Sequence, residues 1–495
     1  MRRYRPLRGI TAATLTLTLN FALTLPSMCA PGTPPRSRDA DTKRDYLETL
    51  IQDRPVVNRI LTIDEAVTIA LKESPIVRGA VDELDAAQGR LSADRARTGP
   101  YVTANTFVSG GSNANSLASP TLIGPQMIQQ LPRNAYFDQN LMAMYPLYSG
   151  GRLSALARKA AALESASAAG AEGRKQEVAL LTRAAYRAVI ARRALVAVQQ
   201  ARVRDDEERL RLDCLRLGQE QIPAYYVQRD EAAGAGARQD LTNALRDTEL
   251  SLIQLETVMG VSPASRVEVT GTTAPPASRE LIASLIAPVV GSMAAAVPPD
   301  SDVLPPDLEA LLRVAEWQRP ELRAAEARVM AAAEDARAVR GGYRPQVSAF
   351  GMGDLSKARG QRGPFAGTTY GVVAAVPLYD SGQRQADTRT ADADRRREEQ
   401  DRARIGLEII QDVRNALLNL RAAEQNVATA KVALESAREE YRVADLRYQS
   451  GRSIVTDSLD ALTARVHAES NVVQATYEYD SAADQLRRAV GETPR

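Results

Sequence analysis

The sequence is poor in the residues on which most active sites depend. It contains one histidine, His467, and two cysteines, and aromatic residues make up 4% of it. No cluster of these residues has the ligand spacing of a metal site, so we expect no metal, no cofactor and no enzymatic activity. The 63 basic and 61 acidic residues leave a net charge of +2. That balance lacks the basic excess typical of a nucleic-acid-binding protein.

Long apolar runs are also missing after the N-terminus. A transmembrane helix needs about 20 consecutive apolar residues, and no segment beyond residue 25 approaches that length. Any insertion of the mature chain into a membrane must therefore be made by β-strands.

The N-terminus has the pattern of an export signal over residues 1–30. Four arginines within the first eight residues precede an apolar, threonine-rich segment, and small residues follow at Ser27 and Ala30. Cys29 lies where a bacterial lipoprotein carries its acylated cysteine, although residues 26–28 match a lipobox poorly. Cleavage with lipidation of Cys29, cleavage without it, and retention as a signal anchor are the alternatives.

The stretch 380–491 contains no proline and shows the longest helical pattern of the chain. Its apolar residues recur at helical spacing, as at Ile409 and Val413. A single interruption at Gly451 predicts two antiparallel helices joined by a tight turn. The first of these helices would be about 100 Å long, so it must belong to an elongated bundle or coiled coil.

The same order of elements occurs twice: two helices, a strand, a loop, a strand, a long helix, a turn and a returning helix. The Pro-Leu-Tyr segment at 146–148 recurs at 377–379, 231 residues later (377 − 146). The glycines of the two predicted tip turns, Gly218 and Gly451, are 233 residues apart (451 − 218). Matched landmarks in one order predict two tandem structural repeats.

The predicted boundaries follow from this order. The chain divides into a signal peptide (1–30), a tether rich in proline, arginine and aspartate (31–60), a first repeat (61–263), a connector (264–305), a second repeat (306–491) and a tail (492–495). The predicted strands are 101–108, 136–148, 343–352 and 367–379. The predicted long helices are 152–217, 223–259, 381–449 and 453–490.

The few aromatic residues gather at the four predicted strands. Eleven of the 22 lie in or beside them, which is the distribution of the aromatic girdles of a membrane β-barrel. Each segment has about the length of a strand that crosses a bilayer, 9–11 residues. Four strands cannot close a barrel and lipid tolerates no open sheet edge, so several chains must share one barrel. A small soluble β-domain between the helices is the alternative.

Taken together, the sequence resembles the TolC-type outer-membrane efflux proteins over about residues 60–491. The segments that carry the resemblance are 61–71, 319–322, 343–345, 376–382 and 446–461. The resemblance implies a mainly α-helical homotrimer, with a 12-stranded β-barrel in the outer-membrane lipid and a 12-helix periplasmic tunnel. It also implies a passive exit duct of a tripartite efflux or type I secretion system. The partners would be a periplasmic adaptor and, through the adaptor, an inner-membrane pump.

The resemblance also implies a gate at the hairpin tips. Asp457 and Asp460 match aspartates that form rings where the family's tunnel narrows, and their spacing places them on one helix face. Tyr448 matches a tyrosine that helps to hold the tip closed, whereas Arg452 lies one place before the family's latch arginine. The first tip, 219–226, lacks an aspartate found there in some relatives. The alternative for both aspartates is a favourable interaction with the helix N-terminus.

Two other interpretations fit parts of the pattern. A periplasmic adaptor also has long helical hairpins, but it would not repeat the whole unit or place aromatic residues in four matched strands. A coiled-coil scaffold is opposed by the strand pairs and by the tight turns at Gly218 and Gly451. We therefore expect a mainly helical chain that contributes four strands to a shared transmembrane barrel.

Overall fold

The computed structural model describes residues 53–109, 136–271, 278–293, 306–358 and 363–492. The predicted signal peptide with Cys29, and all but the end of the predicted tether, lie outside these residues. Among the helices that the structure describes, none is both long and apolar enough to cross a membrane.

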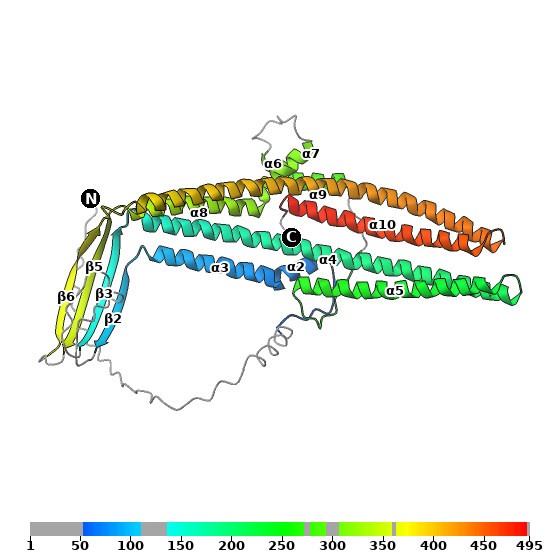
Figure 1. Cartoon of the computed structure of the whole chain (residues 1–495), viewed down its shortest axis with the longest axis horizontal. Coiled ribbons are helices and arrows are strands. Elements are labelled where there is room, and N and C mark those ends of the chain that lie inside the picture. The colour runs from blue at the N-terminus through cyan, green and yellow to red at the C-terminus, as the bar shows by residue number, and fades with distance from the viewer. Residues whose placement is uncertain (1–52, 110–135, 272–277, 294–305, 359–362, 493–495) are drawn as a thin grey trace, which may run out of the picture. The chain divides into compact units, whose positions relative to one another are not determined.

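Two antiparallel helical hairpins make up most of the structure (Figure 1). The first consists of α4 (Arg152–Gly218) and α5 (Ala224–Met259), and the second of α9 (Gln383–Gln449) and α10 (Val455–Ala489). These bounds coincide closely with the predicted helices. Both long helices begin after a glycine in the left-handed region, Gly151 in α4 (φ 86°) and Gly382 in α9 (φ 91°). A left-handed glycine lets the chain turn sharply from strand into helix.

The four shorter helices expected from the two repeats accompany the hairpins. Thr62 caps the first of them: its backbone N–H donates to Glu65 Oε2 at 2.8 Å, and its hydroxyl accepts from the Glu65 N–H at 3.4 Å. Pro75 and Pro320 occupy first-turn positions, where a missing N–H costs nothing. The helices are α2 (Ile63–Glu73), α3 (Pro75–Ala96), α7 (Pro306–Gln318) and α8 (Pro320–Gly342).

A four-stranded antiparallel sheet lies at the other end of the long helices from the hairpin tips (Figure 1). Its strand order is β2-β3-β5-β6, so that β2 and β6 each have an unpaired edge within the described chain. Compared with the predictions, β5 extends further, to Ala358, and β6 ends earlier, at Ala375, before Pro377. The strands are β2 (Tyr101–Ser109), β3 (Tyr136–Tyr148), β5 (Gln346–Ala358) and β6 (Phe365–Ala375).

The helices next to the sheet follow the same lateral order. Helix α3 packs on α4, α4 on α8, and α8 on α9, so α3 and α9 are the outer members as β2 and β6 are. Helices α4 and α8 approach closely where a Cβ on Gly341 would lie 2.8 Å from the Arg152 nitrogen. Glycine is therefore required at this point of contact.

The core is divided into two clusters of buried apolar residues. One joins α2, α4 and α5 and includes Tyr186 and Leu255. The other joins α7, α9 and α10 with a helix that the sequence did not predict, α6 (Ser278–Met293), and includes Leu285 and Leu420. The predicted connector, 264–305, is thus partly folded. Three leucine and isoleucine residues of α6 are buried against the second cluster.

The end of the predicted tether is also part of the fold. Strand β1 (Ile60–Leu61) pairs in parallel with β4 (Glu268–Val269), which lies inside the predicted connector. The buried Tyr186 of α4 holds both strands: its hydroxyl donates to the Leu61 carbonyl at 2.7 Å and accepts from the Thr270 N–H at 3.1 Å. Short strands of two residues carry little pattern in a sequence, which explains why they were missed.

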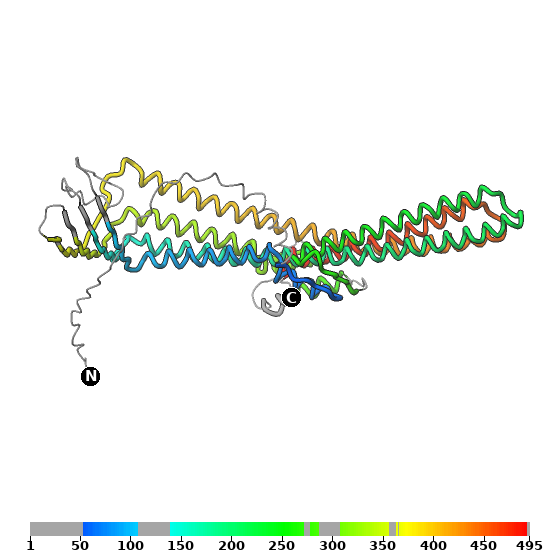
Figure 2. The backbone as a smooth tube through the Cα atoms, turned by 90° about the horizontal axis from the view of Figure 1, so that it is seen from below, coloured from blue at the N-terminus to red at the C-terminus, as the bar shows by residue number. Residues whose placement is uncertain are grey.

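An ion cluster joins the two halves of the chain. Arg187 of α4 lies 2.9 Å from the Asp480 carboxylate and 2.6 Å from that of Asp484, both on α10. Both aspartates are buried, and burial raises the pKa of Asp480 above its ordinary value. Figure 2 shows the two hairpins running beside each other from this region to their tips.

Candidate functional site

The free ends of the two hairpins are tight turns. Helix α4 ends at the exposed Gly218. In the second hairpin Gly451 is left-handed (φ 68°), and its N–H donates to the Tyr448 carbonyl at 3.0 Å. The N–H of Arg452 donates to the Arg447 carbonyl at 2.9 Å, so that the end of α9 is closed by its own backbone. The two predicted turn glycines therefore lie at the two tips.

The predicted gate aspartates lie on the surface of the second tip. Asp457 and Asp460 are both exposed in the first turns of α10. The Ser453 hydroxyl donates to Asp457 at 2.5 Å, and Ser458, between the two aspartates, is buried on the opposite side of the helix. Arg452 is exposed and forms no ion pair within the described residues. The structure thus does not join these three charged residues to Tyr448.

Tyr448 instead connects the second hairpin to the first. Its side chain is buried, and its hydroxyl donates a hydrogen bond to the carboxylate of Asp213, which is fully buried on α4. Burial and this hydrogen bond to a carboxylate raise the pKa of Tyr448 well above its ordinary value. Tyr448 is therefore a neutral donor at any physiological pH.

Arg216, one turn after Asp213, completes this contact. Its Nη1 lies 3.3 Å from Asp213 Oδ1, and its guanidinium group lies 5.2 Å from the centre of the Tyr448 ring. Its Nη2 donates to the Gln449 carbonyl at 3.4 Å. One arginine thus neutralises the buried carboxylate, covers the tyrosine ring and contacts the end of α9. We refer to Tyr448, Asp213 and Arg216 as the tip latch.

The sequence did not identify the aspartate of this latch. The first tip, 219–226, lacks the aspartate found there in some relatives; the structure places the partner of Tyr448 at Asp213, inside α4 rather than in the turn. A signal was present, because Asp206, Arg209 and Asp213 are spaced at three and four residues and occupy the buried side of α4. Charged residues at such positions are ordinarily assigned to solvent, so the pattern was overlooked.

The same buried side of α4 makes further polar contacts. Arg209 is buried, donates to the Ser458 hydroxyl at 3.0 Å and lies 4.0 Å from Asp445. Asp230, on the facing helix α5, is also buried. Hydrogen bonds and charges therefore contribute to holding the tips together, beside buried apolar residues of α10 such as Val455.

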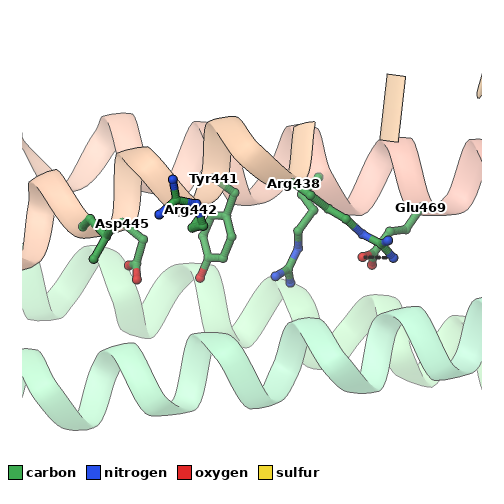
Figure 3. Close-up of a pocket in the computed structure, with 7 residues that line it drawn as sticks. Arg438, Tyr441, Arg442, Asp445 and Glu469 are labelled. Carbon is green, nitrogen blue, oxygen red and sulfur yellow. Dashed lines mark ion pairs between the residues drawn. The ribbon is translucent and has the colours of Figure 1, made fainter. Parts of the chain in front are cut away.

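A shallow groove of about 500 Å³ lies beside these residues, between α9 and α10 (Figure 3). Arg465 of α10 pairs with Asp205 of α4 and stacks over the Tyr441 ring, 4.5 Å from its centre. Arg438 and Glu469, at the other end of the groove, form an ion pair of 3.5 Å. A smaller cavity of about 110 Å³ is lined by Asp213 and Tyr448 and can admit water to the tip latch.

The described residues hold no constellation that suggests catalysis. No group of three or more histidine, cysteine, aspartate and glutamate residues in this part of the chain is arranged to hold a metal ion. Cys214 is an exposed free thiol, and His467 is exposed on α10.

Comparison with known proteins identifies relatives of one kind. Residues 311–492 match the family described as "Outer membrane efflux protein". The outer membrane protein TolC of Vibrio cholerae serotype O1 is 29% identical over 196 residues, covering 37% of this chain and 43% of the relative. TolC of Escherichia coli K12 is 25% identical over 205 residues, covering 38% of this chain and 41% of the relative. The chain thus matches less than half the length of these two relatives.

The fold is shared over a much longer range. The solved structure of the outer-membrane channel OprN superposes with a TM-score of 0.67 at 19% identity, covering 94% of this chain and 98% of that one. At this identity the likeness establishes the fold. It extends the relationship seen in residues 311–492 to the arrangement of helices and strands in both halves.

Proposed function

This chain is a relative of the TolC-type outer-membrane efflux proteins, and on that basis we propose that it forms the outer-membrane exit duct of a tripartite efflux or type I secretion system. It is located in the outer membrane of a Gram-negative bacterium, with a part that extends into the periplasm. Substrates would be delivered by an inner-membrane pump through a periplasmic adaptor. They would then pass through the lumen without further chemistry.

The observation that carries this proposal is the pair of open edges. Strands β2 and β6 have unpaired edges within the described chain, and α3 and α9 are the outer helices on the same two sides. Joining β2 of one copy to β6 of the next would satisfy both edges, as a bilayer requires. Three copies would supply the 12 strands and 12 helical positions that the sequence resemblance implies.

The two faces of the sheet differ as a barrel wall requires. The register aligns Val102, Ala143, Gly351 and Tyr370 in one row across one face, and polar residues such as Thr106 and Gln139 join that face further along the strands. The opposite face carries a hydrogen bond between the Asn105 and Asn140 amides, at 2.9 Å. The first face would contact lipid and the second would line the lumen.

Within this duct the hairpin tips would form the periplasmic gate. Copies of Asp457 and Asp460 from three chains would give two rings of carboxylates that attract cations and repel anions. The tip latch holds the two hairpins of each chain together, so opening would require its release. The order of elements supports two tandem repeats over 61–263 and 306–491, with the segment 264–305 between them.

The alternative of a periplasmic adaptor finds no support. The matched family and both TolC relatives are outer-membrane proteins.

Reconstitution of the purified full-length protein in planar lipid bilayers tests the proposal. We expect an oligomer of three chains by native mass spectrometry and discrete ion-conducting events in the bilayer. A water-soluble monomer, or a trimer that inserts but does not conduct even when the tip latch is removed, would refute the proposed duct.

A further inference from the structure

Two buried carboxyl groups face each other across the first hairpin. Asp213 of α4 is 0% exposed and Asp230 of α5 is 2% exposed. The ion pairs Arg202–Asp240 (2.8 Å) and Arg238–Glu207 (2.9 Å) fix the register of α4 against α5 and place Asp213 opposite Asp230. A hydrogen bond between two carboxyl groups requires a proton on one of them.

Asp230 has no other partner that could balance a negative charge. Neither of its oxygens accepts a hydrogen bond from a donor group of another described residue. Arg216 is engaged with Asp213 at 3.3 Å, and Arg209 with Ser458 at 3.0 Å, so neither cation forms an ion pair with Asp230. An isolated buried carboxylate is costly, and the usual remedy is to keep the group neutral.

All four helices of the tips contribute to the surroundings of the pair. Arg216 matches the charge of Asp213, and Arg209 lies near the carboxylates of Asp206 and Asp445. No cation is therefore left to match a second negative charge on the pair. The charged and titratable groups are Asp206, Arg209 and Arg216 from α4, Tyr226 from α5, and Asp445 and Tyr448 from α9, and α10 adds the neutral Ser458.

A bound cation is a poorer explanation than a proton. Within the described chain, no set of three or more carboxylate, histidine or cysteine ligands is arranged around a common point.

We propose that Asp213 and Asp230 share one proton, and that Asp230 is the positioning residue that keeps Asp213 in place to receive the Tyr448 hydrogen bond. This inference rests on the proposed gate. When the carboxyl group of Asp230 is protonated, its O–H donates to Asp213, whose single charge is matched by Arg216 and Tyr448. When the proton leaves for water in the adjoining 110 Å³ cavity, two buried carboxylates repel each other and α5 is pushed from α4.

The loss of the shared proton is expected to occur at a pH near neutrality. Burial, and secondly the hydrogen bond to Asp213, raise the pKa of Asp230 from 3.8 to about 7. Below that pH the pair retains its proton and the latch is held. Above it the proton is lost, and the tips are expected to separate.

The test measures the distance between the two tips as a function of pH. Spin labels are attached at Gln219→Cys and Arg452→Cys, both exposed turn positions, in full-length protein whose native cysteines are replaced by serine. In detergent, we expect the wild-type distance to increase between about pH 5.5 and 8.5, with a midpoint near 7. No change over this range would overturn the inference.

Two variants and a control separate proton sharing from simple packing. Asp230→Asn is always neutral and its amide still donates to Asp213, so the tips should stay close at every pH. Asp230→Glu restores a titratable group and should restore the pH dependence with a displaced midpoint. Glu249→Gln, which removes an exposed carboxylate of the same helix, should behave as wild type. A wild-type pH profile in Asp230→Asn, or a pH-independent Asp230→Glu, would contradict the proposal.

The outcome is independent of ion conduction. A protein that shows the distance change but never conducts would count against the proposed duct and leave the shared proton in place. A protein that conducts while Asp230→Asn keeps the wild-type pH profile would retain the duct and overturn the shared proton.

Discussion

The hydroxyl of Tyr448 on α9 donates a hydrogen bond to the buried carboxylate of Asp213 on α4, 235 residues earlier in the chain. This contact joins the two hairpins at their free ends, as do the Arg209–Ser458 hydrogen bond and the Arg465–Asp205 ion pair. A hydrogen bond to a charged group contributes about 1.5–3 kcal/mol. That magnitude is large enough to hold a tip closed and small enough for a partner protein to overcome.

Removing this hydrogen bond should loosen the gate. Tyr448→Phe keeps the ring and its contact with Arg216 but leaves Asp213 without one donor, so we expect longer or more frequent open events in bilayer recordings. Tyr441→Phe is the matched control, because its ring stacks with Arg465 and its hydroxyl makes no hydrogen bond within the described residues. Equal open probability in the two variants would show that the tyrosine hydroxyl does not hold the tip.

The acidic rings can be tested by removing both aspartates. Asp457→Ala combined with Asp460→Ala should weaken block by divalent cations and reduce cation selectivity of the single-channel conductance, since up to six carboxylates leave the narrowest point of a trimer. Glu249→Gln, at an exposed position of α5, should leave both properties unchanged. If the double variant conducts and is blocked as wild type, the ring assignment is wrong.

The ion cluster between the halves should matter more for stability than a surface ion pair does. Arg187→Ala leaves Asp480 and Asp484 buried, and the loss of the cation should destabilise the chain by about 3–5 kcal/mol. Arg211→Ala breaks an exposed ion pair with Glu208 and should leave the stability close to that of the wild type. Thermal unfolding followed by circular dichroism compares the two, and equal melting temperatures would contradict the expected difference.

The raised pKa of Asp230 also predicts how stability depends on pH. The folded chain binds this proton more tightly than the unfolded chain, whose pKa is 3.8, so its contribution to stability falls as pH rises from about 4 to about 7. Asp230→Asn should remove this slope. Parallel stability profiles for the two proteins between pH 4.5 and 7.5 would refute it.

The long helices and the strands could be predicted from the sequence because their apolar spacing and alternation extend over many residues. Helices of 67 residues repeat the apolar spacing many times, and Gly382 and Gly451 mark their ends. Strand β6 carries an alternation that places Tyr370, Val372 and Ala374 on one face. These signals are local and need no knowledge of which segments meet.

The missed features all depend on contacts between distant segments. Strands β1 and β4 hold two residues each and exist only because Leu61 and Val269 meet beside Tyr186. Asp213 and Asp230 look like ordinary surface charges until α4, α5 and α9 are brought together. Helix α6 was hidden in a segment whose prolines and small residues suggested a connector.

The tandem arrangement places both halves of the tip latch in one polypeptide. A newly folded subunit can therefore form its tip latch before it assembles with another copy of the chain. An assembly of three such subunits would contain three separate tip latches, and the release of each would have its own free-energy cost. Opening could then proceed through partly released intermediates, and a partner that engages the subunits one after another would never have to overcome all three barriers at once.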